Sequence, residues 1–92
     1  MALDIREFEL DDENEAKAAR HGVRVRELLQ LLDNPFRVFR NRRDRTATHL
    51  LIGRTNGGRT ITVPIEPTPV EGRWRPVTAW PASEAEKARY EG

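Results

Sequence analysis

The sequence predicts an α+β domain: a mostly antiparallel sheet with two N-terminal helices packed on one face. Helix caps and apolar residues at helical spacing are confined to residues 11–33 and to the segment after Ser83. From residue 36 onward the apolar period changes to two, which is typical of strands. The turn Asn56-Gly57-Gly58 joins two such segments, and hairpin connections make neighbouring strands antiparallel.

The N-terminal third is predicted to form one strand and then two helices. Residues 4–10 alternate apolar and acidic side chains, as in a short strand. Asp11 or Asp12 caps a first helix, which has an acidic first turn and ends at Gly22, a left-handed capping position. A second helix spans residues 24–33. Its apolar face consists of Val25, Leu28, Leu29 and Leu32.

The rest of the chain is predicted to add four strands and a C-terminal helix. Pro64 cannot donate a backbone hydrogen bond, so its strand is expected to lie at an edge or to carry a bulge. Trp74 and Trp80 fall on the same face of the last strand, and Ser83 with Glu86 forms a capping box. The predicted order is β-α-α-β-β-β-β-α. The four strands span residues 36–40, 49–54, 59–66 and 73–80, and the helix runs from residue 83 to residue 90.

Length and composition restrict the class of protein. The 92 residues fit one domain, residues 1–92, with a small core. The chain has no cysteine and only two histidines, far apart, so we expect no metal ion and no other cofactor. No apolar run approaches the ~18 residues of a membrane span, and the N-terminus lacks a signal-peptide pattern. These features predict a cytoplasmic protein without a membrane partner.

Charge is strongly segregated along the chain, although the formal net charge is only +1. Residues 1–33 hold nine acidic and five basic side chains, whereas residues 34–80 hold nine arginines and three acidic side chains. Such a basic segment can bind a polyanion such as RNA, or it can be a solvated edge. An arginine-favouring codon bias would also supply it, because fourteen of the sixteen basic residues are arginine. Five arginines fall within nine positions: Arg37, Arg40, Arg42, Arg43 and Arg45.

Arginines on strands can be aimed more rigidly than those in a turn. Arg54 ends one predicted strand, and Arg73 and Arg75 lie on the strand that also carries Trp74 and Trp80. Arginine beside an aromatic ring is a common way to hold a single-stranded base and its phosphate. The alternative is that the two tryptophans close the edge of a small core.

His49, at the start of the strand that ends in Arg54, is the best candidate for proton transfer. It could serve as general acid or base in metal-independent cleavage of RNA through the 2′-hydroxyl, while arginine stabilises the charge on the phosphate. The alternative is a half-buried strand histidine. His21 is explained by its place at a helix C-terminus. The candidate catalytic residues are Arg54, Arg75 and His49, and the candidate RNA-binding residues are Arg40, Arg42, Arg43, Arg45, Arg73 and Trp80.

Several short motifs follow one another along almost the whole chain. They are Asp12-Glu13, Arg20-His21-Gly22-Val23, Asn34-Pro35, Ile52-Gly53-Arg54, Gly58-Arg59, and Thr78-Ala79-Trp80-Pro81-Ala82-Ser83 followed by Glu86, Tyr90 and Glu91. In this order and spacing they resemble the BrnT-like toxin family. The resemblance implies a RelE-like fold and a type II toxin, a ribonuclease that inhibits translation. It also implies a cognate antitoxin, of the ribbon-helix-helix type, that neutralises the toxin and binds the operon's DNA.

The chain departs from the family in its last strand. The family places an arginine after the small residue of that strand, and Trp80 stands there in this sequence. The role of that arginine in holding a phosphate would pass to Arg75 or Arg73, whereas Arg54 matches a family arginine directly. If the role is lost, the resemblance implies a non-catalytic RNA- or protein-binding module of the same fold. The basic surface would in either case suit an acidic antitoxin segment.

Overall fold

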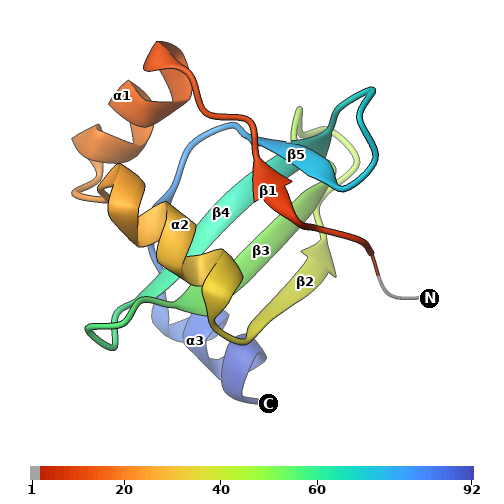
Figure 1. Cartoon of the computed structure of the whole chain (residues 1–92). Helices are drawn as coiled ribbons and strands as arrows, with labels where there is room; N and C mark the ends of the chain where they lie inside the picture. The colour runs from red at the N-terminus through yellow and green to blue at the C-terminus, as the bar shows by residue number, and fades with distance from the viewer. Residues whose placement is uncertain (1–2) are drawn as a thin grey trace.

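The computed structural model describes residues 3–92, which form three helices and a mixed sheet of six strands (Figure 1). The α+β class and the early position of two helices are confirmed. The elements are β1 (Glu7–Phe8), α1 (Asp12–Arg20), α2 (Val25–Asp33), β2 (Phe36–Arg40), β3 (His49–Arg54), β4 (Thr60–Pro67), β5 (Arg73–Pro76), β6 (Trp80–Pro81) and α3 (Glu84–Glu91).

The sheet has the order β1-β5-β4-β3-β2, and β6 pairs with β4 beside β5. Every pairing is antiparallel except that of β1 with β5, so the sheet is mostly antiparallel as predicted. β1, at the edge of the sheet, is shorter than the predicted strand at residues 4–10, because only Glu7 and Phe8 pair with β5. In Figure 1, α2 crosses one face of the sheet with α1 beside it, and α3 lies behind the sheet.

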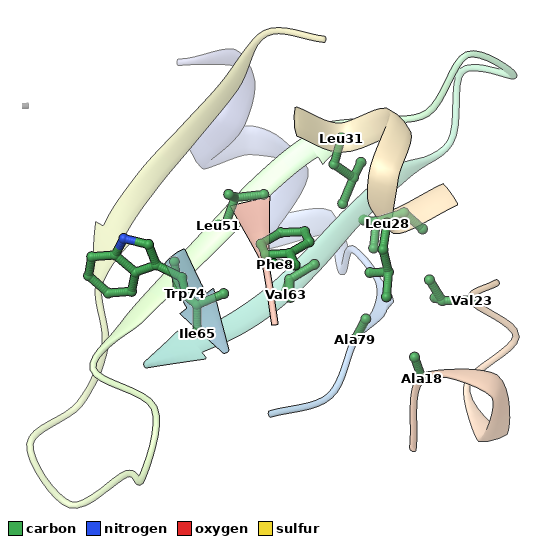
Figure 2. Close-up of a cluster of buried hydrophobic side chains, with 11 residues drawn as sticks. Phe8, Ala18, Val23, Leu28, Leu31, Leu51, Val63, Ile65, Trp74 and Ala79 are labelled. Carbon is green, nitrogen blue, oxygen red and sulfur yellow. The ribbon is translucent and has the colours of Figure 1, made fainter. Parts of the chain in front are cut away.

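The hydrophobic core lies between the sheet and the two N-terminal helices (Figure 2). Leu51 and Val63 extend from adjacent strands toward Leu28 and Leu31 of α2, and all four side chains are fully buried. Leu29, predicted on the apolar face of this helix, is 49% exposed. The buried stripe of α2 therefore passes through Leu28 and Leu31 rather than through Leu28 and Leu29.

The opposite face of the sheet includes Leu50, Ile52 and Thr62 and carries α3; it is the α3 face. α3 begins where the sequence predicts, because Ser83 and Glu86 form the expected capping box. The helix has no buried residue of its own, so polar and aromatic contacts hold it against the sheet. One of them is made by Arg37, which donates hydrogen bonds to the last carbonyls of α3 at 3.0 and 3.3 Å.

β4 is a central strand, so the edge position predicted from Pro64 is wrong. Pro64 pairs with Leu50 on one side, and on the other side its carbonyl accepts a hydrogen bond from Val77 at 2.8 Å. In an antiparallel strand the N–H and C=O of one residue point the same way. The N–H that Pro64 lacks would therefore point into the break between β5 and β6, where no ladder bond has to be made.

The single strand predicted at residues 73–80 is interrupted, which adds a strand to the predicted order. β5 ends at Pro76 and β6 begins at Trp80. The interruption restarts the two-residue alternation of side chains. Trp74 therefore packs beside Phe8 in the core, whereas Trp80 lies opposite Thr62 on the α3 face. The prediction that both tryptophans share one face is wrong.

Candidate functional site

A groove of about 580 Å³ opens on the α3 face, between the loop of residues 41–48 and the start of α3. The break between β5 and β6 contributes to it, because Pro64 and Val77 line the groove together with Leu50. The remaining surface is polar and mostly basic. Its charged or aromatic residues are Arg40, Arg42, Arg45, Trp80, Glu86 and Arg89. Arg40 lies at its edge, because its pairing with His49 directs its side chain to the other face of the sheet.

The loop of residues 41–48, here called the arginine loop, is closed by Asn41. The side-chain amide of Asn41 donates to the carbonyl of Ala47 at 3.0 Å, and its backbone N–H donates to the carbonyl of Thr48 at 2.9 Å. Its side-chain oxygen accepts from the N–H of Arg42 at 2.9 Å. Ala47 is buried and anchors the far side of the loop. Arg42, Arg43 and Arg45 are thus presented by a loop that is fixed at both ends.

The groove arginines are not compensated by acidic side chains. Within residues 3–92, no carboxylate oxygen lies within 4.0 Å of a guanidinium nitrogen of Arg40, Arg42, Arg43, Arg45 or Arg89. The guanidinium of Arg89 instead stacks over the ring of Phe39, 4.2 Å from its centroid. Arg43 is exposed on the same loop but does not line the groove. The groove therefore has an attractive potential for anions.

Trp80 is held in the groove by a carboxylate of α3. Its indole Nε1 donates to Glu86 Oε1 at 3.1 Å, and Thr62 Oγ1 donates to the same oxygen at 3.0 Å. Burial alone would raise the pKa of Glu86, but hydrogen bonds from Ser83, Trp80 and Thr62 together lower it below the ordinary value. Glu86 is therefore ionised at neutral pH, and its side chain is half-buried between Trp80 and Thr62.

Arg73 and Arg75, predicted to contact RNA or phosphate, are instead paired with carboxylates of the protein. Arg73 Nε lies 3.7 Å from carboxylate oxygens of both Glu7 and Glu9. Arg75 donates a short hydrogen bond to Asp11, which raises the pKa of Arg75 and lowers that of Asp11. The set, here called the β5 ion-pair cluster, comprises Arg73 and Arg75 with Glu7, Glu9, Asp11, Glu13 and Glu66.

Arg54 lies at the end of β3 and does not line the groove. Its guanidinium is 3.3 Å from a carboxylate oxygen of Glu91 and 6.0 Å from the ring centroid of Tyr90. The amide of Asn34 donates to the carbonyl of Arg54 at 2.8 Å, and Tyr90 Oη donates to the carbonyl of Pro35 at 3.0 Å. These motif residues therefore join the end of α2 to the ends of β3 and α3.

His49 lies on the core side of the sheet, directly across from Arg40 in the β2–β3 pairing. Its ring meets that of Trp74 edge-on, with 5.5 Å between centroids, and its Nδ1 is hydrogen-bonded to Thr48 Oγ1 at 2.8 Å. Burial, and secondly the charge of Arg40, lowers the pKa of His49 below its usual value. The imidazole is therefore neutral at pH 7.

The structure does not bring the three candidate catalytic residues together. His49 and Arg54 occupy opposite ends of β3, and an interval of five residues places their side chains on opposite faces of the sheet. Arg75 lies two strands away, in the β5 ion-pair cluster. Of the candidate RNA-binding residues, by contrast, Arg40, Arg42, Arg45 and Trp80 line one groove.

Two groove residues were not singled out by the sequence as part of a site. Arg89 reaches the groove because α3 folds back across β2 and β3, about fifty residues from Phe39 along the chain. Glu86 was recognised only as a capping residue. A capping box indicates where a helix begins but not which strand it covers, so no local signal marks either side chain as part of the groove.

Comparison with known proteins does not identify a family: no family model matches the chain, and no curated protein matches it. Within residues 3–92 there is no group of three or more histidine, cysteine, aspartate or glutamate side chains placed to hold a metal ion. None of the helices in this part of the chain is both long and apolar enough to span a membrane.

Proposed function

We propose that this protein binds single-stranded RNA through the groove that contains Trp80. The observation that carries the proposal is the set of uncompensated guanidinium groups around a tryptophan, contributed by Arg42, Arg45 and Arg89. Guanidinium groups pair with phosphates, and an indole ring can stack on a base of any sequence. A groove of about 580 Å³ is in the range of pockets that hold nucleotide-sized ligands.

We also propose that the chain is a RelE-like, BrnT-type toxin. The element order, with two helices before the antiparallel strands, supports this assignment. So does the meeting of Asn34, Pro35, Arg54 and Tyr90, four residues of the resembling motifs, at one junction. Its partner would be a cognate ribbon-helix-helix antitoxin with an acidic segment that covers the basic groove. A short ribbon-helix-helix reading frame beside the gene would support this partner.

Metal-independent cleavage of RNA is the second candidate function. It is favoured by the pairing of His49, a neutral imidazole, with Arg40, an arginine without a carboxylate partner, on the core side of the sheet. A general base must be unprotonated before it can accept the proton of a 2′-hydroxyl. The binding-only function is favoured by Trp80, which replaces the arginine that the family places in this strand, and by the separation of His49, Arg54 and Arg75.

RNA binding is tested by fluorescence anisotropy with a labelled single-stranded oligoribonucleotide over a range of salt concentrations. We expect affinity to fall steeply with salt, and the double variant Arg42→Ala/Arg45→Ala to bind about tenfold more weakly. Arg43→Ala is the matched control, because Arg43 lies on the same loop without lining the groove. Salt-independent binding, or no binding at low salt, would refute the proposal.

Cleavage is tested separately by induced expression and by incubation of the purified protein with RNA. Growth arrest and RNA fragments that disappear with His49→Ala, but persist with His21→Ala, would support the ribonuclease. Intact RNA and normal growth, despite well-folded protein, would leave the binding module as the function. Suppression of growth arrest by a neighbouring reading frame would support the antitoxin.

A further inference from the structure

The two carboxylate oxygens of Glu86 accept different numbers of hydrogen bonds from the protein. Its Oε1 accepts hydrogen bonds from Thr62 Oγ1 at 3.0 Å, from the Ser83 N–H at 2.8 Å and from Trp80 Nε1 at 3.1 Å. Within residues 3–92, its Oε2 receives only a longer hydrogen bond from Trp80, at 3.4 Å. Each carboxylate oxygen can accept about two hydrogen bonds, so Oε2 retains the capacity to accept another.

This oxygen lies beside the one aromatic ring that lines the groove. Because the indole Nε1 is hydrogen-bonded to Glu86, the carboxylate is fixed at the edge of the Trp80 ring. A base stacked against that ring would present its own hydrogen-bonding edge near the carboxylate. An anion in a groove for phosphates weakens binding unless the ligand offers it a donor. The donor has to come from a part of the nucleotide other than the phosphate.

We infer that Glu86 determines base specificity: the groove selects a base with an exocyclic amino group, such as cytosine, over uracil. Cytosine presents an N4 amino donor at the position where uracil presents the O4 acceptor. An ionised carboxylate accepts a hydrogen bond from the amino group, and it repels the carbonyl oxygen. The other carboxylate oxygen of Glu86 is fully used in holding Trp80, Thr62 and the start of α3. This inference rests on the proposed binding of single-stranded RNA.

The test compares the binding of labelled oligocytidylate and oligouridylate of equal length to the full chain at neutral pH. We expect the cytidylate to bind about tenfold more tightly, as for one hydrogen bond to a charged group. The variant Glu86→Gln keeps a capping acceptor at this helix position and a carbonyl oxygen for the three donors at Oε1. It places an amide N–H₂ where Oε2 was. We therefore expect the preference to disappear or to reverse toward the uridylate.

The possible results separate the inference from the proposed function. Equal affinity for the two oligomers, with binding still weakened by Arg42→Ala/Arg45→Ala, would overturn the inference and leave RNA binding intact. An unchanged cytidylate preference in a folded Glu86→Gln variant would also overturn it. Absence of binding to both oligomers would refute the proposed function. If Glu86→Gln fails to fold, the unmodified chain still tests the inference. Equal affinity of the unmodified chain for oligocytidylate and oligouridylate is enough to refute it.

Discussion

The arginines of the groove and those of β5 have the same chemistry but different surroundings. Arg42 and Arg45 project from an anchored loop, and within residues 3–92 no carboxylate approaches their guanidinium groups within 4.0 Å. Arg75 has four carboxylates within that distance: Glu9, Asp11, Glu13 and Glu66. The loop arginines can therefore pair with an anionic ligand. The arginines of β5 instead form ion pairs that join β1 and the start of α1 to β5.

The charge segregation along the sequence does not persist in the folded protein, because part of the acidic segment pairs with part of the basic segment. The acidic N-terminal segment does more than cap and solvate its helices, because Glu7, Glu9 and Asp11 pair with arginines more than sixty residues away. The basic half of the sequence is therefore partly neutralised by the acidic half. Only the arginines that the fold leaves without such partners can contribute a strong field to binding.

The largest effect expected from the comparison is on stability, at Trp74. Trp74 is 9% exposed and packs in the core beside Phe8 and His49, whereas Trp80 lies half-buried in the groove. Trp74→Ala should lower the free energy of unfolding by about 3–5 kcal/mol, measured by urea denaturation. Trp80→Ala should cost less stability but weaken RNA binding by about 1–3 kcal/mol, the value of one stacked base. A larger loss of stability from Trp80→Ala, or a larger loss of RNA affinity from Trp74→Ala, would contradict this assignment.

The next largest effect is on RNA affinity, where the groove arginines should matter and those of the β5 ion-pair cluster should not. Arg42→Ala/Arg45→Ala should weaken binding about tenfold and reduce the slope of log affinity against log salt by about 1.4, or about 0.7 for each phosphate contact. Arg73→Ala removes the same kind of charge from the β5 ion-pair cluster, and we expect nearly unchanged affinity and slope. Equal losses in both variants would show that only total charge matters, which would contradict the comparison.

The sequence predicts most of the fold because its signals are local. The caps at Asp11 and Ser83, the turn at Asn56-Gly57-Gly58 and the two-residue alternation each act within a few residues, and all four appear in the structure. The strand position predicted from Pro64 was wrong, because a central strand can contain a proline where the neighbouring strand is interrupted. The break has a local signal that the prediction of one strand overlooked: Pro76 interrupts residues 73–80, and the apolar residues shift from Trp74 to Val77 and Ala79.

The candidate site was predicted only in part, because charge compensation is a long-range property. The sequence indicated the arginine loop and Trp80. It contains no sign that Arg75 would be surrounded by carboxylates from the segment between β1 and α1 and from the first turn of α1. It also could not place Arg89 and Glu86 in the groove, since their position depends on the packing of α3 against the sheet.

A smaller effect concerns the acid stability of the β5 ion-pair cluster. The hydrogen bond from Arg75 is the main cause that holds the pKa of Asp11 below its ordinary value of 3.8. A carboxylate whose pKa is lower in the folded state stabilises the fold above pH 3.8, and this contribution is lost as the pH falls through the folded-state pKa. Thermal melts should therefore show a lower Tm at pH 3 than at pH 5.

The matched variant for this effect is Asp11→Asn. Asparagine still caps a helix through its side-chain oxygen, so the contact with the N–H of Asn14 can be kept. The charge on Arg75 then loses the carboxylate that holds it most closely, so we expect a lower Tm at neutral pH and a smaller further decrease of Tm between pH 5 and pH 3. An acid profile identical to that of the unmodified chain would show that Asp11 does not contribute to this pH dependence.

The smallest effect is on His49, whose titration reports the uncompensated charge of Arg40. Burial is the larger cause of its lowered pKa and the charge of Arg40 the smaller, so Arg40→Ala should raise the pKa only part of the way toward 6.5. Because the unfolded chain binds this proton more tightly, acidification below about pH 6.5 destabilises the native state until the folded-state pKa is passed. NMR titration of the imidazole measures the shift, with Arg73→Ala as the control that should leave it unchanged. RNA bound in the groove should leave this pKa almost unchanged, because the side chains of Arg40 and His49 lie on the other face of the sheet. A pKa raised as far as by Arg40→Ala would instead place an RNA phosphate beside Arg40 on the core side.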